Sequence, residues 1–263
     1  MKHVAKKRFG QNFLTDQGVI DSLVDAISPK ADDLMVEIGP GLGALTKPLL
    51  HKLDMLHVVE VDRDIIDWMQ KEYAKKSITI HNSDALKFDF GSLGKNLRVV
   101  GNLPYNISTP ILFHLLDNVR HITDMHFMLQ KEVVERMVAT PGDTDFGRIS
   151  VMLQYRFHIE WLIDVPPESF DPAPKVQSAV VRLIPKDVSE LHAKKLEKLS
   201  QVVQTAFSQR RKMLRSALSS RYGGSAPAEE VLSSAGIDPT LRGEALEISA
   251  FVAIARREIE IGS

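Results

Sequence analysis

Five short runs rich in valine and isoleucine alternate with segments of helical periodicity, and this alternation restricts the fold of the chain. The runs are continuously apolar, as expected for parallel strands covered on both faces. Strands that alternate with helices predict a doubly wound α/β sheet. The expected strands are 34–38, 56–61, 78–81, 97–101 and 125–130, and the expected helices are 16–27, 46–51, 65–75, 109–116 and 131–138.

A change of pattern near residue 186 predicts a second domain. Two further strands, 151–165 and 178–184, flank a proline-rich loop and are expected to pair antiparallel at one edge of the sheet. Helical periodicity dominates afterwards, with breaks at glycines and prolines. We therefore expect a sheet domain over 1–185 and a small all-α domain over 186–263, with helices at 191–218, 228–235 and 248–259.

The composition excludes several classes of protein. The chain has no cysteine, which rules out disulfides and thiolate metal sites. Its nine histidines show no metal-ligand spacing, so we predict no metal. No apolar run approaches the roughly 20 residues of a membrane helix, and no apolar core follows the basic start of the chain. A net charge of -1 argues weakly against nucleic-acid binding. We expect a cytoplasmic protein, and nothing demands more than a monomer.

A glycine-rich turn follows the first expected strand and predicts a cofactor site. Residues 37–43 read Glu-Ile-Gly-Pro-Gly-Leu-Gly, and glycines let a backbone turn tightly and approach a ligand. Glu60 ends the next strand, where an acid would bind a ribose diol, and Asp84 could accept a hydrogen bond from an adenine amine. Thr46 stands where a dinucleotide site has glycine or alanine, and the upstream acid favours the cationic S-adenosylmethionine. A tight loop, a solvated carboxylate and a helix N-cap at Asp84 are the alternatives.

The most informative stretch is 101–106, Gly-Asn-Leu-Pro-Tyr-Asn, which follows the fourth expected strand. Open α/β sheets bind ligands at such strand ends. Adenine N6 is a poor nucleophile, and the Asn102 oxygen with the Leu103 carbonyl could accept its two N–H bonds and localise its lone pair. Proline restricts the preceding Leu103 to extended geometry, and Tyr105 offers a ring for base stacking. The alternative is a simple turn with a tyrosine in the core.

Several motifs in order carry a resemblance to one enzyme family. Asn-Leu-Pro-Tyr resembles the Asn/Asp-Pro-Pro-Tyr motif of amino-methyltransferases. Together with the segments 7–14, 166–176 and 207–212, it resembles the KsgA (RsmA) family of small-subunit ribosomal RNA adenine N6,N6-dimethyltransferases. The match runs from about residue 6 to near the C-terminus. It implies a Rossmann-like class I S-adenosylmethionine methyltransferase sheet.

The resemblance implies roles for individual residues. Cofactor contacts would come from Asn12, Leu14, Gly39, Gly41, Glu60, Asp84 and Asn102. Asn102 would also hold the target amine with Leu103, while Tyr105 and Phe170 would stack on the base from either side. Read alone, Phe170 is more typical of a loop anchor packed on the core. Met213 and Gly243 depart from the usual family pattern, and both lie in the expected helical domain.

Basic residues predict an RNA-binding surface. The candidates are Lys7, Arg8, Lys175, Arg210, Arg211, Lys212 and Arg215, of which the last four are expected on one helix. Such a cluster alone is more typical of a solvated helix face. The family implies that the substrate is 16S rRNA within an immature small ribosomal subunit, with two adjacent adenines of a hairpin loop near the 3′ end modified. Each base would have to leave its stack.

Three alternatives remain open at this point. The chain could act mainly as a ribosome-assembly factor, because its basic patches and helical domain suit binding. It could be a relative that methylates large-subunit rRNA, although the helical C-terminal segment argues against this. A nucleotide-dependent dehydrogenase is disfavoured by Thr46 and by Asn-Leu-Pro-Tyr.

Overall fold

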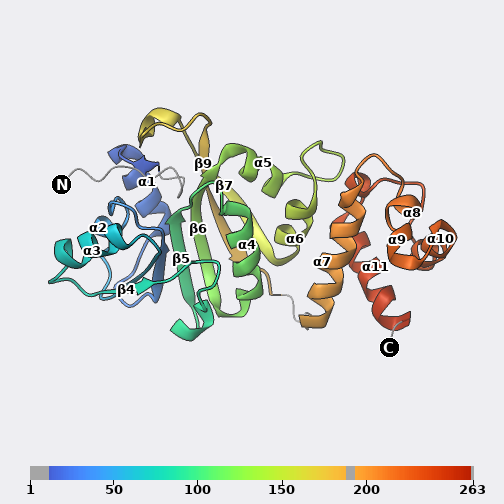
Figure 1. Cartoon of the computed structure of the whole chain (residues 1–263), viewed down its shortest axis with the longest axis horizontal. Helices are drawn as coiled ribbons and strands as arrows, with labels where there is room; N and C mark the ends of the chain where they lie inside the picture. Colours follow the sequence, from blue (N-terminus) through green and yellow to red (C-terminus); the bar gives the residue numbers. More distant parts are fainter. Residues whose placement is uncertain (1–11, 188–192, 262–263) are drawn as a thin grey trace. The chain divides into compact units, whose positions relative to one another are not determined.

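The computed structural model describes residues 12–187 and 193–261, which contain a seven-stranded sheet (Figure 1). The strand order is β4-β3-β2-β5-β6-β9-β7, and strands β2 to β6 run parallel to one another. Strand β9 is antiparallel to β6, and β7 lies beside β9 at the edge. The strands are β2 (Met35–Ile38), β3 (Leu56–Glu60), β4 (Ile78–Asn82), β5 (Leu97–Asn102), β6 (Ile122–Gln130), β7 (Phe157–Val165) and β9 (Ser178–Pro185).

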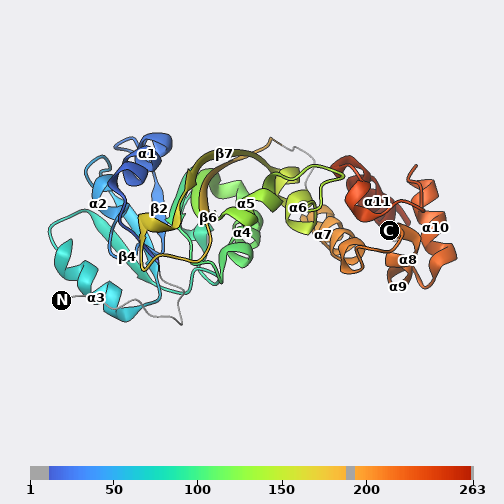
Figure 2. The ribbon, with the colours of Figure 1, turned by 90° about the horizontal axis from the view of Figure 1, so that it is seen from above.

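Helices cover both faces of this sheet, which explains why the strands are continuously apolar. One face forms a core with α1, α2 and α3, and its strand residues include Val58, Val100, Met128 and Val180. Alternate strand residues point to the other face, and α4 lies on that side (Figures 1 and 2). The helices are α1 (Gln17–Ile27), α2 (Thr46–Leu49), α3 (Arg63–Glu72), α4 (Ser108–Asp117) and α5 (Lys131–Val138), with 3-10 turns η2 (Phe90–Leu93), η3 (Val119–His121) and η4 (Pro167–Ser169).

The order of the strands creates a switch point between β2 and β5. From β2 the chain moves outward to β3 and β4 and then returns to β5 on the other side of β2. The carboxyl ends of β2 and β5 therefore meet where helices leave in opposite directions, which is where such sheets bind ligands. The glycine-rich turn follows β2, and Asn102 ends β5.

A small second sheet joins the start of the described chain to the proline-rich loop. Strand β1 (Phe13–Leu14) pairs antiparallel with β8 (Phe170–Asp171). The Ser169 carbonyl accepts hydrogen bonds from the Thr15 and Asp16 amides at 2.9 and 3.2 Å. The Asp16 carboxylate caps α1 and accepts a hydrogen bond from the Ser169 hydroxyl at 2.9 Å. Segments more than 150 residues apart are thus held together beside the switch point.

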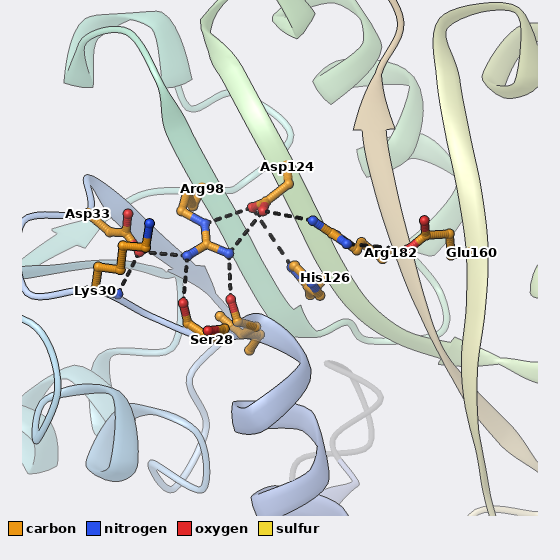
Figure 3. Close-up of polar contacts among 9 residues, drawn as sticks. Ser28, Lys30, Asp33, Arg98, Asp124, His126, Glu160 and Arg182 are labelled. Carbon is orange, nitrogen blue, oxygen red and sulfur yellow. Dashed lines mark hydrogen bonds and ion pairs between the residues drawn. The ribbon is translucent and has the colours of Figure 1, made fainter.

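An ion-pair network occupies the amino ends of β5 and β6, opposite the switch point (Figure 3). Arg98 donates to both Asp124 oxygens at 2.9 Å and to Asp33 at 2.6 Å. It also donates to the carbonyls of Ile27 and Ser28, which the end of α1 leaves without helical partners. Arg98 therefore ties α1 to the sheet.

The expected strand over 151–165 is wrong in its first part. Helix α6 (Arg148–Arg156) precedes β7, which begins only at Phe157. The five residues 149–153 are all buried. A helix segment buried on all sides has the same continuous apolar pattern as a buried strand, so periodicity could not separate the two.

Contacts within the chain divide the described residues into two compact units. One contains 12–134 and 158–185, and the other contains 135–157, 186–187 and 193–261. The second unit thus adds 135–157 to the segment expected to form a helical domain. Besides α6 it includes α7 (Ala193–Ser208), α8 (Leu214–Ala217), α9 (Ser219–Tyr222), α10 (Ser225–Ser234), η5 (Gly243–Ala245) and α11 (Ile248–Ile261). None of the helices described is both long and apolar enough to cross a membrane.

The single helix expected over 191–218 is also wrong, because α7 ends at Ser208 and α8 begins at Leu214. The Leu214 amide donates to the Leu241 carbonyl at 2.7 Å, and the Arg215 amide donates to Pro239 at 3.1 Å. These tertiary contacts satisfy the first amides of α8 and start a new helix there. The basic residues 210–212 consequently lie in a turn.

Candidate active site

A pocket of about 790 Å³ opens at the switch point of the sheet unit. Its walls come from the ends of β2, β3 and β5, from the turn after β4 and from the segment around β1. A volume of this size suits a nucleoside cofactor together with part of a substrate. Among the predicted site residues, the pocket is lined by Asn12, Leu14, Gly39, Gly41, Glu60, Asp84, Asn102, Leu103 and Tyr105.

The glycine-rich turn needs its glycines for two different reasons. Gly39 and Gly41 have φ angles of +64° and +54°, which side chains rarely adopt. A Cβ on Gly41 would also lie 3.1 Å from the Phe13 ring. A Cβ on Gly39 would meet only Pro104, at 3.8 Å, and would otherwise occupy the pocket. The turn therefore keeps space open for a ligand against bare backbone.

Two buried carboxylates stand behind this turn. The Thr46 hydroxyl donates to Glu37 at 2.6 Å, and the amides of Val61 and Asp62 donate to one oxygen of Glu60 at 2.8 Å each. Burial raises the pKa of Glu37 to about 7, with a smaller contribution from the negative charge of Glu60. Burial likewise raises the pKa of Glu60. A cationic ligand would lower the free-energy cost of ionising either buried carboxyl group, because it would stabilise the carboxylates.

Asp84 lies in the turn after β4. One of its oxygens accepts a hydrogen bond from the Leu86 amide at 3.0 Å, so the side chain caps a turn. Asp84 also lines the pocket. Capping the turn leaves Asp84 able to bind a ligand as well, since a carboxylate can accept several hydrogen bonds.

Asn102 has its side chain held by the segment around β1. Its Nδ2 donates to the Asn12 carbonyl at 3.1 Å. Within residues 12–187 and 193–261, no hydrogen bond uses its Oδ1 or the Leu103 carbonyl, and both residues line the pocket. Gly101 permits this arrangement, because a Cβ there would lie 2.6 Å from the Ile38 carbonyl oxygen at the end of β2. Two acceptors are thus available at one place.

Tyr105 and Phe170, the two predicted stacking residues, differ in position. Tyr105 is half-buried and lines the pocket, and its hydroxyl lies 2.7 Å from the Ser178 hydroxyl. Phe170 is 4% exposed, packs in the core beside Leu14 and does not line the pocket. The structure therefore brings Tyr105 to Asn102 but places Phe170 as an anchor of its loop.

Comparison with known proteins identifies the family. The model of the ribosomal RNA adenine dimethylase family matches residues 2–257. The chain belongs to this family. It is 64% identical to the ribosomal RNA small subunit methyltransferase A of Dechloromonas aromatica, over 96% of this chain and 97% of the relative. It is 63% identical to the protein of that name from Methylobacillus flagellatus, over 97% and 98%.

Solved structures agree with this assignment. A dimethyladenosine transferase from Plasmodium falciparum superposes with a TM-score of 0.82 at 25% identity, over 95% of this chain and 98% of the other. The 23S rRNA methyltransferase ErmE shares the fold, with a TM-score of 0.68 at 24% identity, over 94% and 99%. The predictions of the family and of a Rossmann-like methyltransferase sheet are confirmed. The prediction of an enzyme that uses S-adenosylmethionine is also confirmed.

The pocket fits S-adenosylmethionine better than a dinucleotide. Three acids line it, Glu37, Glu60 and Asp84, against one lysine and one histidine. Excess negative charge favours a cofactor with sulfonium and ammonium groups and opposes a pyrophosphate. Glu60 ends β3, and Asp84 follows the neighbouring strand β4, so both acids line the pocket from adjacent strand ends.

The predicted RNA-binding residues fall into three groups. Lys7 and Arg8 lie outside the described residues. Lys175 is exposed in the loop before β9. In the helical unit, Arg210 donates to the carbonyls of Thr144 and Phe146, and Arg215 pairs with Glu229 at 3.1 Å. The side chains of Arg211 and Lys212 are exposed and have no ionic partner among the described residues.

The sequence missed two residues that hold the site together. Thr46 was noted only as a departure from a dinucleotide fingerprint, yet its hydroxyl is the hydrogen-bond donor to Glu37. Ser178 was expected only as the start of a strand, and it contacts Tyr105. The spacing of nine residues between Glu37 and Thr46 was a usable signal, since both flank the glycine-rich turn. No local signal links Tyr105 to Ser178, 73 residues apart.

Proposed function

We propose that this enzyme methylates N6 of two adjacent adenines in a hairpin loop near the 3′ end of 16S rRNA, within an immature small ribosomal subunit. Each adenine would become N6,N6-dimethyladenosine. The observation that carries the proposal is the orientation of Asn102, whose Nδ2 is engaged by Asn12 while its Oδ1 remains available in the pocket. The names of the relatives above support the choice of the small subunit.

The available acceptors suit an exocyclic amine. An adenine N6 has two hydrogens, and its lone pair is delocalised into the ring. Asn102 Oδ1 and the Leu103 carbonyl would each accept one hydrogen, which localises the lone pair on nitrogen and makes it nucleophilic. S-adenosylmethionine supplies an electrophilic methyl group when bound. No strong general base is required, because the amine loses its proton only after it has become cationic.

The base would be held by stacking on Tyr105, since aromatic rings stack on any base. A base inside a helix cannot reach the pocket, so each adenine would leave its stack first. Stacking of Phe170 on the opposite face stays a prediction, because this ring is part of the core in the structure.

The helical segment 186–263 is the proposed rRNA-binding domain. Arg211 and Lys212 are the best candidates for phosphate contacts there, because their charges are not neutralised within the described chain. Arg210 and Arg215 have protein partners and would contribute less. Lys175, exposed in the loop before β9, would add a further contact. A cytoplasmic monomer stays a prediction from the sequence.

The decisive experiment is methyl transfer from labelled S-adenosylmethionine to small subunits that lack this modification. Mature small subunits and large subunits serve as controls. We expect close to four methyl groups per unmodified small subunit and little on either control. Equal or greater transfer to large subunits would instead place this chain with the large-subunit enzymes. No transfer to any of them would overturn the proposed substrate.

A further inference from the structure

The tyrosine proposed to stack on the target base lies on irregular backbone. Tyr105 is in the turn between β5 and α4 and has a half-buried side chain. The residue lines the pocket of about 790 Å³, so protein atoms do not surround it completely. Among residues 12–187 and 193–261, the only hydrogen bond of its side chain joins its hydroxyl to the Ser178 hydroxyl at 2.7 Å. Without this contact, little would fix the orientation of the ring.

Ser178 lies in a buried, hydrogen-bonded part of the sheet. It is 0% exposed and begins β9, where it pairs with Gln130 of β6. The adjoining Gln177 carbonyl accepts a hydrogen bond from the Lys131 amide at 2.9 Å. Strand β6 in turn pairs with β5, where Met128 lies opposite Asn102. Three neighbouring strands therefore fix the Ser178 hydroxyl relative to Asn102.

Ser178 cannot act on a ligand directly. It does not line the pocket, and its hydroxyl is engaged by Tyr105. Burial raises the pKa of Tyr105, so its hydroxyl is neutral at physiological pH and can take part in this bond as donor or acceptor. The contact thus links the stacking ring to the strand system that carries the acceptor for the target amine.

We infer that Ser178 is a positioning residue for methyl transfer, because its hydrogen bond to Tyr105 holds the stacking ring at a fixed place relative to Asn102. This inference rests on the proposed function. Stacking would hold the flipped adenine in one plane, and the amine would meet its acceptors only if that plane is correct. A small misplacement of reacting groups costs much of the rate.

The test is a double-mutant cycle of Ser178→Ala and Tyr105→Phe, with unmodified small subunits as substrate at saturating S-adenosylmethionine. Each variant removes one side of the same hydrogen bond, so we expect each to lower kcat about tenfold. The double variant should be no slower than the slower single variant. The affinity of the Ser178→Ala variant for S-adenosylmethionine, measured by calorimetry, should not change, because Ser178 lies outside the pocket.

Tyr105→Phe keeps the inference testable even if Ser178→Ala folds poorly. It deletes the same hydrogen bond, but at a residue that is only half-buried. Ser150→Ala is a matched control: Ser150 is also 0% exposed, its hydroxyl donates to the Arg136 carbonyl at 2.5 Å, and neither residue lines the pocket. We expect it to lower stability and leave kcat unchanged.

Two results would overturn the inference while the proposed function stands. The first is a kcat equal to that of the wild type in either single variant. The second is a double variant whose kcat falls by the product of the two single losses. Absence of methyl transfer by the wild-type chain would instead contradict the proposed function itself. The two failures are therefore distinguishable in one set of assays.

Discussion

Strand β5 carries polar side chains at both ends, and the two ends are built differently. At its amino end, Arg98 makes hydrogen bonds to two carboxylates and two carbonyls, and these use all five donors of its guanidinium group (Figure 3). At its carboxyl end, Asn102 has one group engaged and one available. Only three residues lie between Arg98 and Asn102 along the strand.

Two buried carboxyl groups on the strands beside β5, Asp124 of β6 and Glu37 of β2, differ in the same way. Asp124 is buried but compensated by Arg98 at 2.9 Å. Glu37 is buried beside Glu60 with no cation paired to it among the described ion pairs, and its pKa rises to about 7. A polar group whose partners are all present stabilises the fold, whereas one whose partners are missing costs stability and can bind a ligand. Substitutions at the amino end should therefore lower stability and spare activity. Substitutions at the carboxyl end should impair methyl transfer or ligand binding without lowering stability.

The largest effect is expected for Asn102→Ala. It removes an acceptor aimed at the reacting amine, so methyl transfer should fall by about 10²–10³, the loss typical of one preorganised polar contact. The initial rate on unmodified small subunits measures this, and the unfolding midpoint should change little. Asn82→Ala is the control, because Asn82 is exposed at the end of β4. Full methyl transfer by Asn102→Ala would refute the role of that side chain.

Arg98→Met should show the converse behaviour. It leaves two carboxylates and two carbonyls without their donor, and we expect a loss of about 3 kcal/mol in the free energy of unfolding. Both tryptophans lie in the sheet unit, so fluorescence during urea unfolding reports on this unit. The rate per folded enzyme should stay within about twofold.

Arg182→Met is the control for that substitution. The Arg182 side chain is 36% exposed and makes only long contacts, 3.5 Å to Glu160 and 4.0 Å to Asp124, so its removal should cost at most about 1 kcal/mol. Equal losses in the two arginine variants would contradict the assignment of stability to the Arg98 network.

Glu37→Gln should increase stability, with a defined pH dependence. The folded pKa of Glu37 is about 7 against an ordinary 4.5, so the folded state binds the proton more tightly. The free energy of unfolding therefore falls as pH rises from about 4.5 to 7. The amide cannot ionise, and the variant should be more stable than wild type at pH 8 by on the order of 2 kcal/mol.

Urea unfolding of the ligand-free protein at pH 5 and pH 8 measures this difference. The two proteins should converge at pH 5, where the wild-type carboxyl is protonated. A variant that is less stable than wild type at pH 8 would show that Glu37 is already compensated when ionised.

The smallest effect is expected for Asp84→Asn. The amide oxygen can still cap the turn at Leu86, but its NH₂ group would face the adenine amine of the cofactor in place of an acceptor. The dissociation constant for S-adenosylmethionine should rise about tenfold in calorimetry. Asp89→Asn, an exposed substitution outside the pocket, should leave it unchanged. An unaltered constant in Asp84→Asn would restrict Asp84 to its capping role.

The elements of the sheet unit were predictable because their signals are local. Continuous apolar runs, a glycine-rich turn and an acid at the end of β3 each follow from a few consecutive residues, and the structure places them as expected. The failures occurred where local pattern is ambiguous. Helix α6 is buried like a strand, and the end of α7 depends on contacts between Leu214 and Leu241.

The sequence by itself determined the α/β alternation, the cofactor turn and the Asn-Leu-Pro-Tyr motif, since these depend on neighbours along the chain. Only the tertiary structure decided which polar groups have partners. It engaged Arg210, left Arg211 without an ionic partner within residues 12–187 and 193–261, buried Phe170 and set Ser178 against Tyr105. Such choices depend on strand order and register, which join residues far apart in the chain and leave no trace in local periodicity.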